Sequence, residues 1–300
     1  MGAANLHSSS NKSAAARRLT AKNIERIGDA HKSVYDEDQK AQSSVERLAN
    51  RKYGVIQTSI KNFIQSYERL MQIEFKESDG IKELSDPNLI RKNLDSMKSN
   101  LDGVLASVKE TDSKGVGFLS AMLSGGGILC AGGMIAARVG LPLTFGSVAA
   151  ALNPILIPAT FAVALTKSFS DDSANELRAA QIQKKYANVV VAQAESNVEV
   201  LRAVHERADR LTDLLTKLNV LFIKSLQVVN PIIDKNGKDR TAYTAQDKEL
   251  IRNCLNLADA VKSVLDTPLF ENDGTIAEVS ACVLKTGEDY LQRMQQIMTA

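Results

Sequence analysis

Apolar and polar positions divide this sequence into two charged arms on either side of one long apolar stretch, residues 115–166. The stretch contains no acidic residue and a single basic one, Arg138, whereas the residues on both sides are densely charged. A membrane-spanning helix needs about 20 mainly apolar residues. Residues 116–137 and 143–165 each supply such a run, and the glycine and proline between the two runs favour a chain reversal. The pattern therefore predicts an apolar hairpin of two helices.

Small residues inside this hairpin recur every fourth position, which is the spacing that lets helices approach closely. In lipid, such close packing drives helix association, and proline is tolerated better in membrane helices than in soluble ones. We therefore expect the hairpin to contact a membrane, and its permanent burial inside a soluble bundle is the alternative. The residues expected to take part in insertion are Gly117, Ala121, Gly125, Gly126, Gly127, Gly132, Gly133, Ala136, Arg138, Gly140, Pro142, Phe145, Pro154, Pro158 and Phe161.

Arg138, the only charge in the hairpin, has two interpretations of equal weight. Charged residues in membrane segments are often functional, so the arginine either contacts lipid phosphates or lines a pore. Alternatively it caps the hairpin turn, since a long basic side chain near a helix end reaches the polar surface at little cost.

The two arms carry apolar residues alternating by three and four, which predicts long helices that pack along coiled-coil seams. In the first arm the stripe begins at Ile24 and shifts by one position from Ile56, a change of phase that alters the supercoil locally. In the second arm it begins at Asn197, and the helix is predicted to stop before Pro231. The predicted seam residues are Ile24, Ile27, Val34, Val45, Leu48, Asn197, Leu201, Leu211, Leu215, Leu218 and Phe222.

Helix stop and start signals complete the division of the chain. Ser78–Gly80 is a break, Thr244 with Asp247 starts a helix that ends before Pro268, and Thr275 caps a last helix. The predicted fold class is all-α, an elongated bundle of long antiparallel helices with a central apolar helical hairpin. Its parts are a disordered tail (1–12), an N-terminal helical arm (13–114), the membrane-inserting hairpin (115–166), a long return helix (167–230) and a C-terminal helical pair (231–300).

Composition removes several classes of function. The chain has 37 basic and 35 acidic residues, so bulk charge gives no case for nucleic-acid binding. The three cysteines are widely separated and the three histidines show no metal-ligand spacing, which argues against a zinc site. No serine or cysteine nucleophile lies in a recognisable motif. We therefore expect no enzyme activity, no metal and no cofactor.

Long amphipathic helices around a central apolar hairpin resemble the α-helical pore-forming toxins of the cytolysin A and haemolysin BL type. The resemblance is architectural, and it covers residues 13–112, 115–166 and 171–229. It implies a soluble form with a hidden hairpin, followed by insertion and oligomerisation in a lipid membrane, with copies of the chain or related helical subunits as partners. Residues 1–18 contain no apolar signal-peptide core, so we expect synthesis in the cytoplasm, membrane association, and any export by a non-standard route.

Two further functions fit the same pattern. A constitutively membrane-anchored coiled-coil scaffold would hold partners through its seams and use the hairpin as an anchor. A defence effector would damage the membrane of its own cell, and the sequence does not separate this from a secreted toxin. A soluble bundle that buries its hairpin and has no membrane role is the remaining interpretation.

Overall fold

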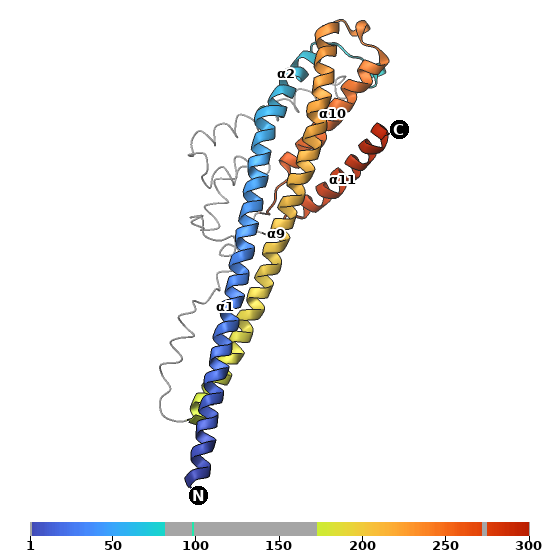
Figure 1. Cartoon of the computed structure of the whole chain (residues 1–300). Helices are drawn as coiled ribbons and strands as arrows, with labels where there is room; N and C mark the ends of the chain where they lie inside the picture. Colours follow the sequence, from blue (N-terminus) through green and yellow to red (C-terminus); the bar gives the residue numbers. More distant parts are fainter. Residues whose placement is uncertain (1, 82–97, 99–172, 272–274, 300) are drawn as a thin grey trace. The chain divides into compact units, whose positions relative to one another are not determined.

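The computed structural model describes residues 2–81, 98, 173–271 and 275–299, and most of these residues are helical (Figure 1). The long helices are α1 (Gly2–Val55), α9 (Ser173–Asn236), α10 (Ala245–Asp266) and α11 (Glu278–Thr299), with a shorter α2 (Lys61–Leu70). A π-helical turn spans Ile56–Ile60, and 3-10 turns span Glu77–Asp79 and Arg240–Ala242. Within the described ranges, extended backbone pairs only in an isolated bridge between Phe270 and Ile276. The predicted all-α fold class is confirmed.

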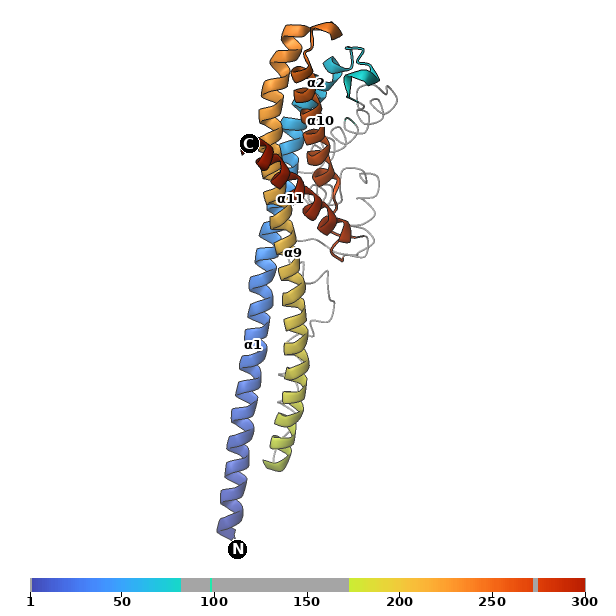
Figure 2. The ribbon, with the colours of Figure 1, turned by 90° about the vertical axis from the view of Figure 1, so that its right-hand side faces the viewer.

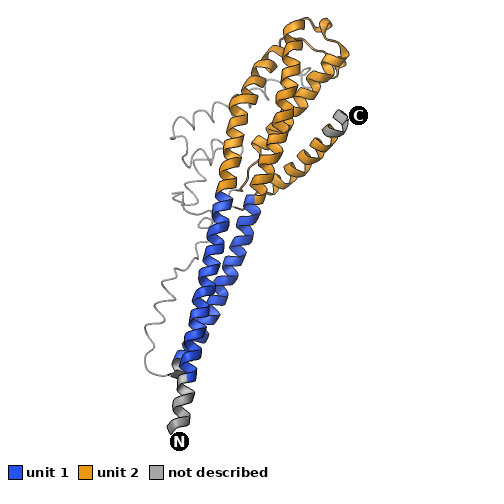
Figure 3. Ribbon diagram, in the orientation of Figure 1, with its two compact units in different colours: residues 1–42, 144–205 blue, residues 43–143, 206–300 orange. Residues whose placement is uncertain are grey.

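The chain forms two compact units, and α1 and α9 contribute to both of them (Figure 3). Unit 1 contains the described residues up to Gln42 together with residues 173–205 of α9. Unit 2 contains the described residues from Ser43 to Ile81 and from Glu206 onward.

In unit 1, α1 and α9 lie side by side and run in the same direction (Figures 1 and 2). Arg26 Nη1 on α1 donates a hydrogen bond to Asn188 Oδ1 on α9 at 2.9 Å. Further along both helices, Glu37 pairs with His205. Because the partners advance together along the two helices, the pair is parallel. The antiparallel direction predicted for the arms is therefore wrong for α1 and α9.

Unit 2 repeats this parallel order and adds a helix of the opposite direction. Arg47 pairs with Asp209, and further on Arg69 of α2 pairs with Asp234. Helix α10 runs in the opposite direction. Lys52 of α1 donates to the carbonyl of Thr267, which follows the last residue of α10. Asp79, which lies beyond α2, accepts instead from Lys248 in the first turn of α10. The predicted antiparallel packing therefore holds for α10 against the α1–α2 segment.

Helix α11 packs against α9 in unit 2 where a glycine allows close approach. Arg207 and Arg210 of α9 bond to Ser280 and Glu288 of α11, in the same order along both helices. A Cβ atom on Gly287 would lie 2.7 Å from a methyl group of Leu214, closer than such atoms approach. The missing side chain therefore fixes how near the two helices come.

The core of unit 2 is built from the second-arm heptads and two small aromatic groups. Leu211, Leu215, Leu218 and Phe222 are fully buried, and burial of each such side chain contributes about 1.5–3 kcal/mol. The ring of Phe222 lies 5.4 Å from that of Phe63, measured between centroids. A second contact, between Phe75 and Tyr243, joins the segment after α2 to the segment before α10.

Two predicted boundaries were wrong. Of the residues predicted as a disordered tail, 1–12, residues 2–12 belong to α1, which begins at Gly2. Once a helix is nucleated, extension by one residue is cheap, and no proline stops it here. The return helix, predicted to stop before Pro231, continues through it to Asn236. A proline inside a helix removes one backbone hydrogen bond, and here the buried Ile233 beyond it holds the last turns against the core.

Other sequence signals are confirmed. The predicted phase shift at Ile56 is the π-helical turn itself, which takes up one extra residue. The break before Ile81 places Gly80 at a φ of +73°, a conformation that suits glycine. Thr244 and Asp247 form a capping box, and α10 ends at Asp266 as predicted. Thr275, by contrast, precedes the bridge residue Ile276, so α11 begins later, at Glu278.

The apolar hairpin, residues 115–166, lies outside the described residues, as does the part of the predicted N-terminal arm after Ile81 apart from Lys98. Within the described part of the chain, no helix combines the length and apolarity that a membrane crossing needs.

Candidate functional site

Most of the predicted seam residues are buried between α1 and α9, each within its own unit. Val34, Asn197 and Leu201 are buried in unit 1, and Val45 and Leu48 are buried in unit 2 with the second-arm core residues. Ile27 is partly buried. The side chains that the heptads placed in the seam are therefore mostly buried. All the residues predicted for membrane insertion, from Gly117 to Phe161, lie outside the described residues.

Ile24 is the exception in the seam, because its side chain is 58% exposed. Its neighbour Asn23 is buried instead and donates a hydrogen bond to the Ala180 carbonyl at 3.4 Å. Counting back from Ile27, the seam thus continues by four residues rather than by three. The prediction failed because it followed hydrophobicity, whereas a buried asparagine with a backbone partner satisfies the same position.

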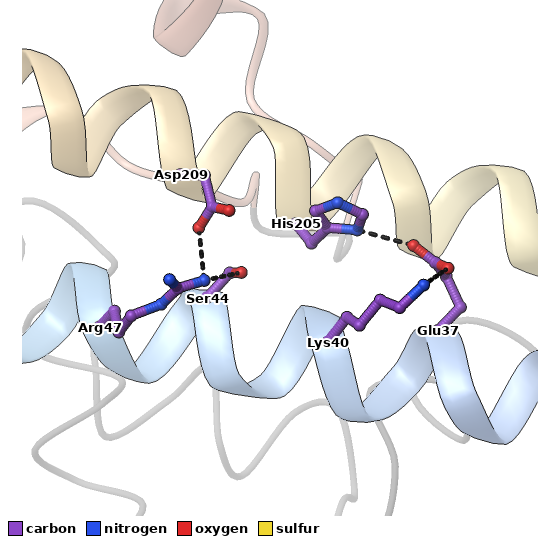
Figure 4. Close-up of polar contacts among 6 residues, drawn as sticks. All are labelled: Glu37, Lys40, Ser44, Arg47, His205 and Asp209. Carbon is purple, nitrogen blue, oxygen red and sulfur yellow. Dashed lines mark hydrogen bonds and ion pairs between the residues drawn. The ribbon is translucent and has the colours of Figure 1, made fainter.

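In unit 1 the seam contains a buried carboxylate with two basic partners (Figure 4). Glu37 Oε1 lies 2.7 Å from His205 Nδ1, and Lys40 Nζ donates to Glu37 Oε2 at 3.1 Å. Burial alone would raise the pKa of Glu37, but the hydrogen bond from Lys40 and the charges of Lys40 and His205 outweigh it and hold this pKa below its ordinary value. The cluster joins the two helices by charge. The sequence analysis treated His205 only as one of three histidines without metal-ligand spacing, and it did not find this partner.

In unit 2 the first polar contact between the same helices is exposed. Arg47 Nη2 donates to Asp209 Oδ1 at 2.9 Å and to Ser44 Oγ at 2.8 Å (Figure 4). Solvent surrounds both charged partners, so this ion pair contributes about 0–1 kcal/mol. The ion pair is informative because it shows which residues of α1 and α9 lie opposite each other.

Lys52 is the most deeply buried charged residue among those described, with 1% of its surface exposed. Its ammonium donates to the Leu265 carbonyl at 3.0 Å and to the Thr267 carbonyl at 2.6 Å, at the C-terminal end of α10. Burial lowers the pKa of Lys52 to about 7, against the opposing field of Asp266. In the sequence, Lys52 is a polar residue within the heptads of the first arm, and the spacing gives no sign of its carbonyl partners.

The last described turn before the hairpin region is fixed to α10 by Asp79. Its carboxylate accepts from Lys248 at 2.7 Å and from the backbone amide of Lys76 at 2.8 Å, and it lies 3.5 Å from Arg240 Nε. The hydrogen bond from Lys248 is the largest of the effects that lower the pKa of Asp79. The break signal Ser78–Gly80 is thus an anchored turn.

These polar groups serve packing and alignment in the described residues. Within those ranges, no group of three or more histidine, cysteine or acidic side chains is placed to bind a metal ion. The chemistry available at the seam is helix association through apolar layers with a few paired charges.

Comparison with protein-family models, with curated proteins and with solved structures finds no match for this chain.

Proposed function

We propose that this chain is a non-enzymatic membrane-inserting protein of the pore-forming type. Residues 115–166 enter the bilayer, and the helices of both units remain in water. The observation that carries the proposal is the single charge, Arg138, in this whole stretch. Two runs of the length that a bilayer core demands follow each other there.

The packing of the arms supports the proposal that they remain in water while the hairpin inserts. The seams of α1 and α9 are filled by their own apolar residues, such as Leu48 and Leu201, each fully buried. The described helices thus pack their apolar stripes against one another. The driving force for insertion is removal of the hairpin's apolar surface from water, about 25 cal/mol per Å², and its small-residue faces pack against other copies in lipid.

Dye release from liposomes tests the proposal. The purified full chain is expected to release dye, and Gly126→Leu or Gly133→Leu is expected to lower that release several-fold, because a bulky side chain keeps apart helices that pack through small residues. The matched control is Gly28→Leu on α1, where an added Cβ atom meets no atom within 4 Å. Vesicle binding without leakage in every lipid mixture tried would contradict the pore.

A membrane-anchored scaffold is the second candidate, and one observation favours it. Ile182 and Val189, seven residues apart on α9, are 56% and 63% exposed. Residues at that spacing share a helix face, so unit 1 offers an apolar stripe to a partner helix. Cell fractionation separates the two functions: a scaffold is found only in the membrane pellet, whereas a pore-forming protein also has a stable soluble state.

A further inference from the structure

The direction of the helices in unit 1 brings the starts of α1 and α9 to the same end (Figures 1 and 2). Thr20 of α1 donates a hydrogen bond to Gln183 of α9 at 3.1 Å, which places the early turns of both helices level. The apolar stretch ends at Thr166, and α9 begins at Ser173. Only the six residues 167–172 separate them, so the Cα atoms of Thr166 and Ser173 lie at most about 25 Å apart even when the chain is fully extended. If the hairpin is inserted, as the proposed function requires, this end of unit 1 lies close to the bilayer surface.

The same end carries the chain's concentration of positive charge. Residues 1–24 contain no acidic residue and four basic ones, Lys12, Arg17, Arg18 and Lys22. The chain's net charge is +2 and these residues carry +4, so the remaining residues carry −2. All four side chains are exposed. The positive charge is therefore local, and the small net charge of the whole chain does not reveal it.

The start of α9 adds to this charge. Arg178, Lys184 and Lys185 are exposed on its first turns, and none of the seven basic residues belongs to an ion pair that the structure describes. The acidic residues nearest in sequence are Glu25, which is exposed, Glu176, which is partly buried, and Asp171 and Asp172, which lie outside the described residues. Seven exposed cations thus outnumber the acids at this end.

We propose that the basic end of unit 1, formed by Lys12, Arg17, Arg18, Lys22, Arg178, Lys184 and Lys185, binds the anionic headgroups of a lipid bilayer. The inference rests on the proposed function and specifies its first step. An anionic membrane surface attracts clustered basic side chains within about one Debye length. The protein then approaches the bilayer with the end from which the hairpin can reach it. Lipid is favoured over nucleic acid because Thr166, the last residue of the apolar stretch, lies so near in the chain.

Vesicle flotation of the full chain tests this surface. Binding is expected to rise with the fraction of phosphatidylserine in phosphatidylcholine vesicles and to fall when salt is raised from about 50 mM to about 300 mM. The variant Arg17→Gln/Arg18→Gln/Lys22→Gln is expected to bind phosphatidylserine vesicles at least roughly tenfold more weakly. The control Lys61→Gln/Lys224→Gln/Lys285→Gln removes three exposed charges from unit 2 and is expected to bind like the wild type. Circular dichroism checks that both variants keep their helices.

Binding and dye release are recorded separately, so that the two proposals fail in different ways. Equal loss of binding in both triple variants, or loss in neither, would overturn the lipid surface and leave pore formation untouched. Binding that depends on Arg17, Arg18 and Lys22 without any dye release would support the lipid-binding surface and contradict pore formation. Binding of duplex DNA at the same salt, with no binding to vesicles, would assign the basic end to nucleic acid and overturn the inference.

Discussion

At the scale of single residues, the seams contain charges that hydrophobic patterning would exclude. A buried ion is costly unless its partners compensate for lost water. Glu37 is paired with Lys40 and His205, and Lys52 donates to two carbonyls at the C-terminal end of α10. Because each carbonyl lies at one defined place, Lys52 fixes α1 against the end of α10 in unit 2. Its contribution is alignment more than stability.

Substitution of Lys52 is expected to change how stability depends on pH. Its pKa is lowered on folding, from the ordinary 10.5 to about 7, so between these values the unfolded chain binds the proton more tightly. The free energy of unfolding therefore rises as pH is raised through this window, by roughly 1 kcal/mol per pH unit. Lys52→Met is expected to abolish this rise and to be more stable than the wild type near pH 7.

Urea unfolding of both proteins at several pH values measures this difference. Lys52→Arg serves as the control, because a guanidinium stays charged throughout; it is expected to be destabilised and to show no recovery at alkaline pH. Identical pH profiles for the wild type and Lys52→Met would show that the ammonium is not buried.

At the scale of elements, the π-helical turn Ile56–Ile60 reconciles two stretches of heptads. The seam of α1 passes through Leu48 and Val55, and that of α2 passes through Phe63 and Leu70, one position out of phase. The wider turn accommodates one extra residue and so brings both stretches onto the same side. The phase shift was visible in the sequence, whereas the way the backbone absorbs it was not.

Deletion of Thr58 is expected to be tolerated, since it converts the π-helical turn into ordinary α-helix and keeps both stretches on the seam. Thr58 is exposed; its hydroxyl donates to the Gly54 carbonyl at 2.7 Å and lies 3.5 Å from the hydroxyl of its neighbour Ser59. Deletion of the equally exposed Lys32 rotates the preceding part of α1 by about 100° relative to α9. Thermal unfolding should show a small change in Tm for the first and a large decrease for the second; the reverse order would refute the extra-residue explanation.

At the scale of the whole molecule, the decisive feature is the parallel direction of α1 and α9 in both units. Parallel neighbours cannot be joined by a short turn, so the connection between them has to carry the chain back to the start of α9. The apolar stretch lies within that connection. The parallel direction also brings the basic starts of both helices together in unit 1, which an antiparallel pair would separate.

Cysteine cross-linking tests the direction. In a chain without its natural cysteines, Arg47→Cys/Asp209→Cys and Arg69→Cys/Asp234→Cys are each expected to form a disulfide, because these positions are ion-paired across the helices of unit 2. The exchanged pairs, 47 with 234 and 69 with 209, are expected to remain reduced under mild oxidation. Cross-linking of the exchanged pairs alone would indicate antiparallel helices.

Local patterns were sufficient for much of this protein. Heptads predicted the seam from Val34 to Leu48 and from Leu201 to Phe222, since a helix must bury whichever stripe is apolar. Caps and breaks predicted the limits of α10 and the turn at Gly80, because those signals act within a few residues of themselves.

Only the tertiary structure decided what depends on distant partners. The heptad pattern is the same in parallel and antiparallel helix pairs, so the direction of α9 relative to α1 could not be predicted from the spacing of apolar residues. Asn23 replaces Ile24 in the seam because the Ala180 carbonyl is there to accept its hydrogen bond. Helix α9 passes Pro231 because tertiary packing compensates for the lost backbone bond. Each outcome was set by groups more than a hundred residues away or by the shared core, which no local window contains.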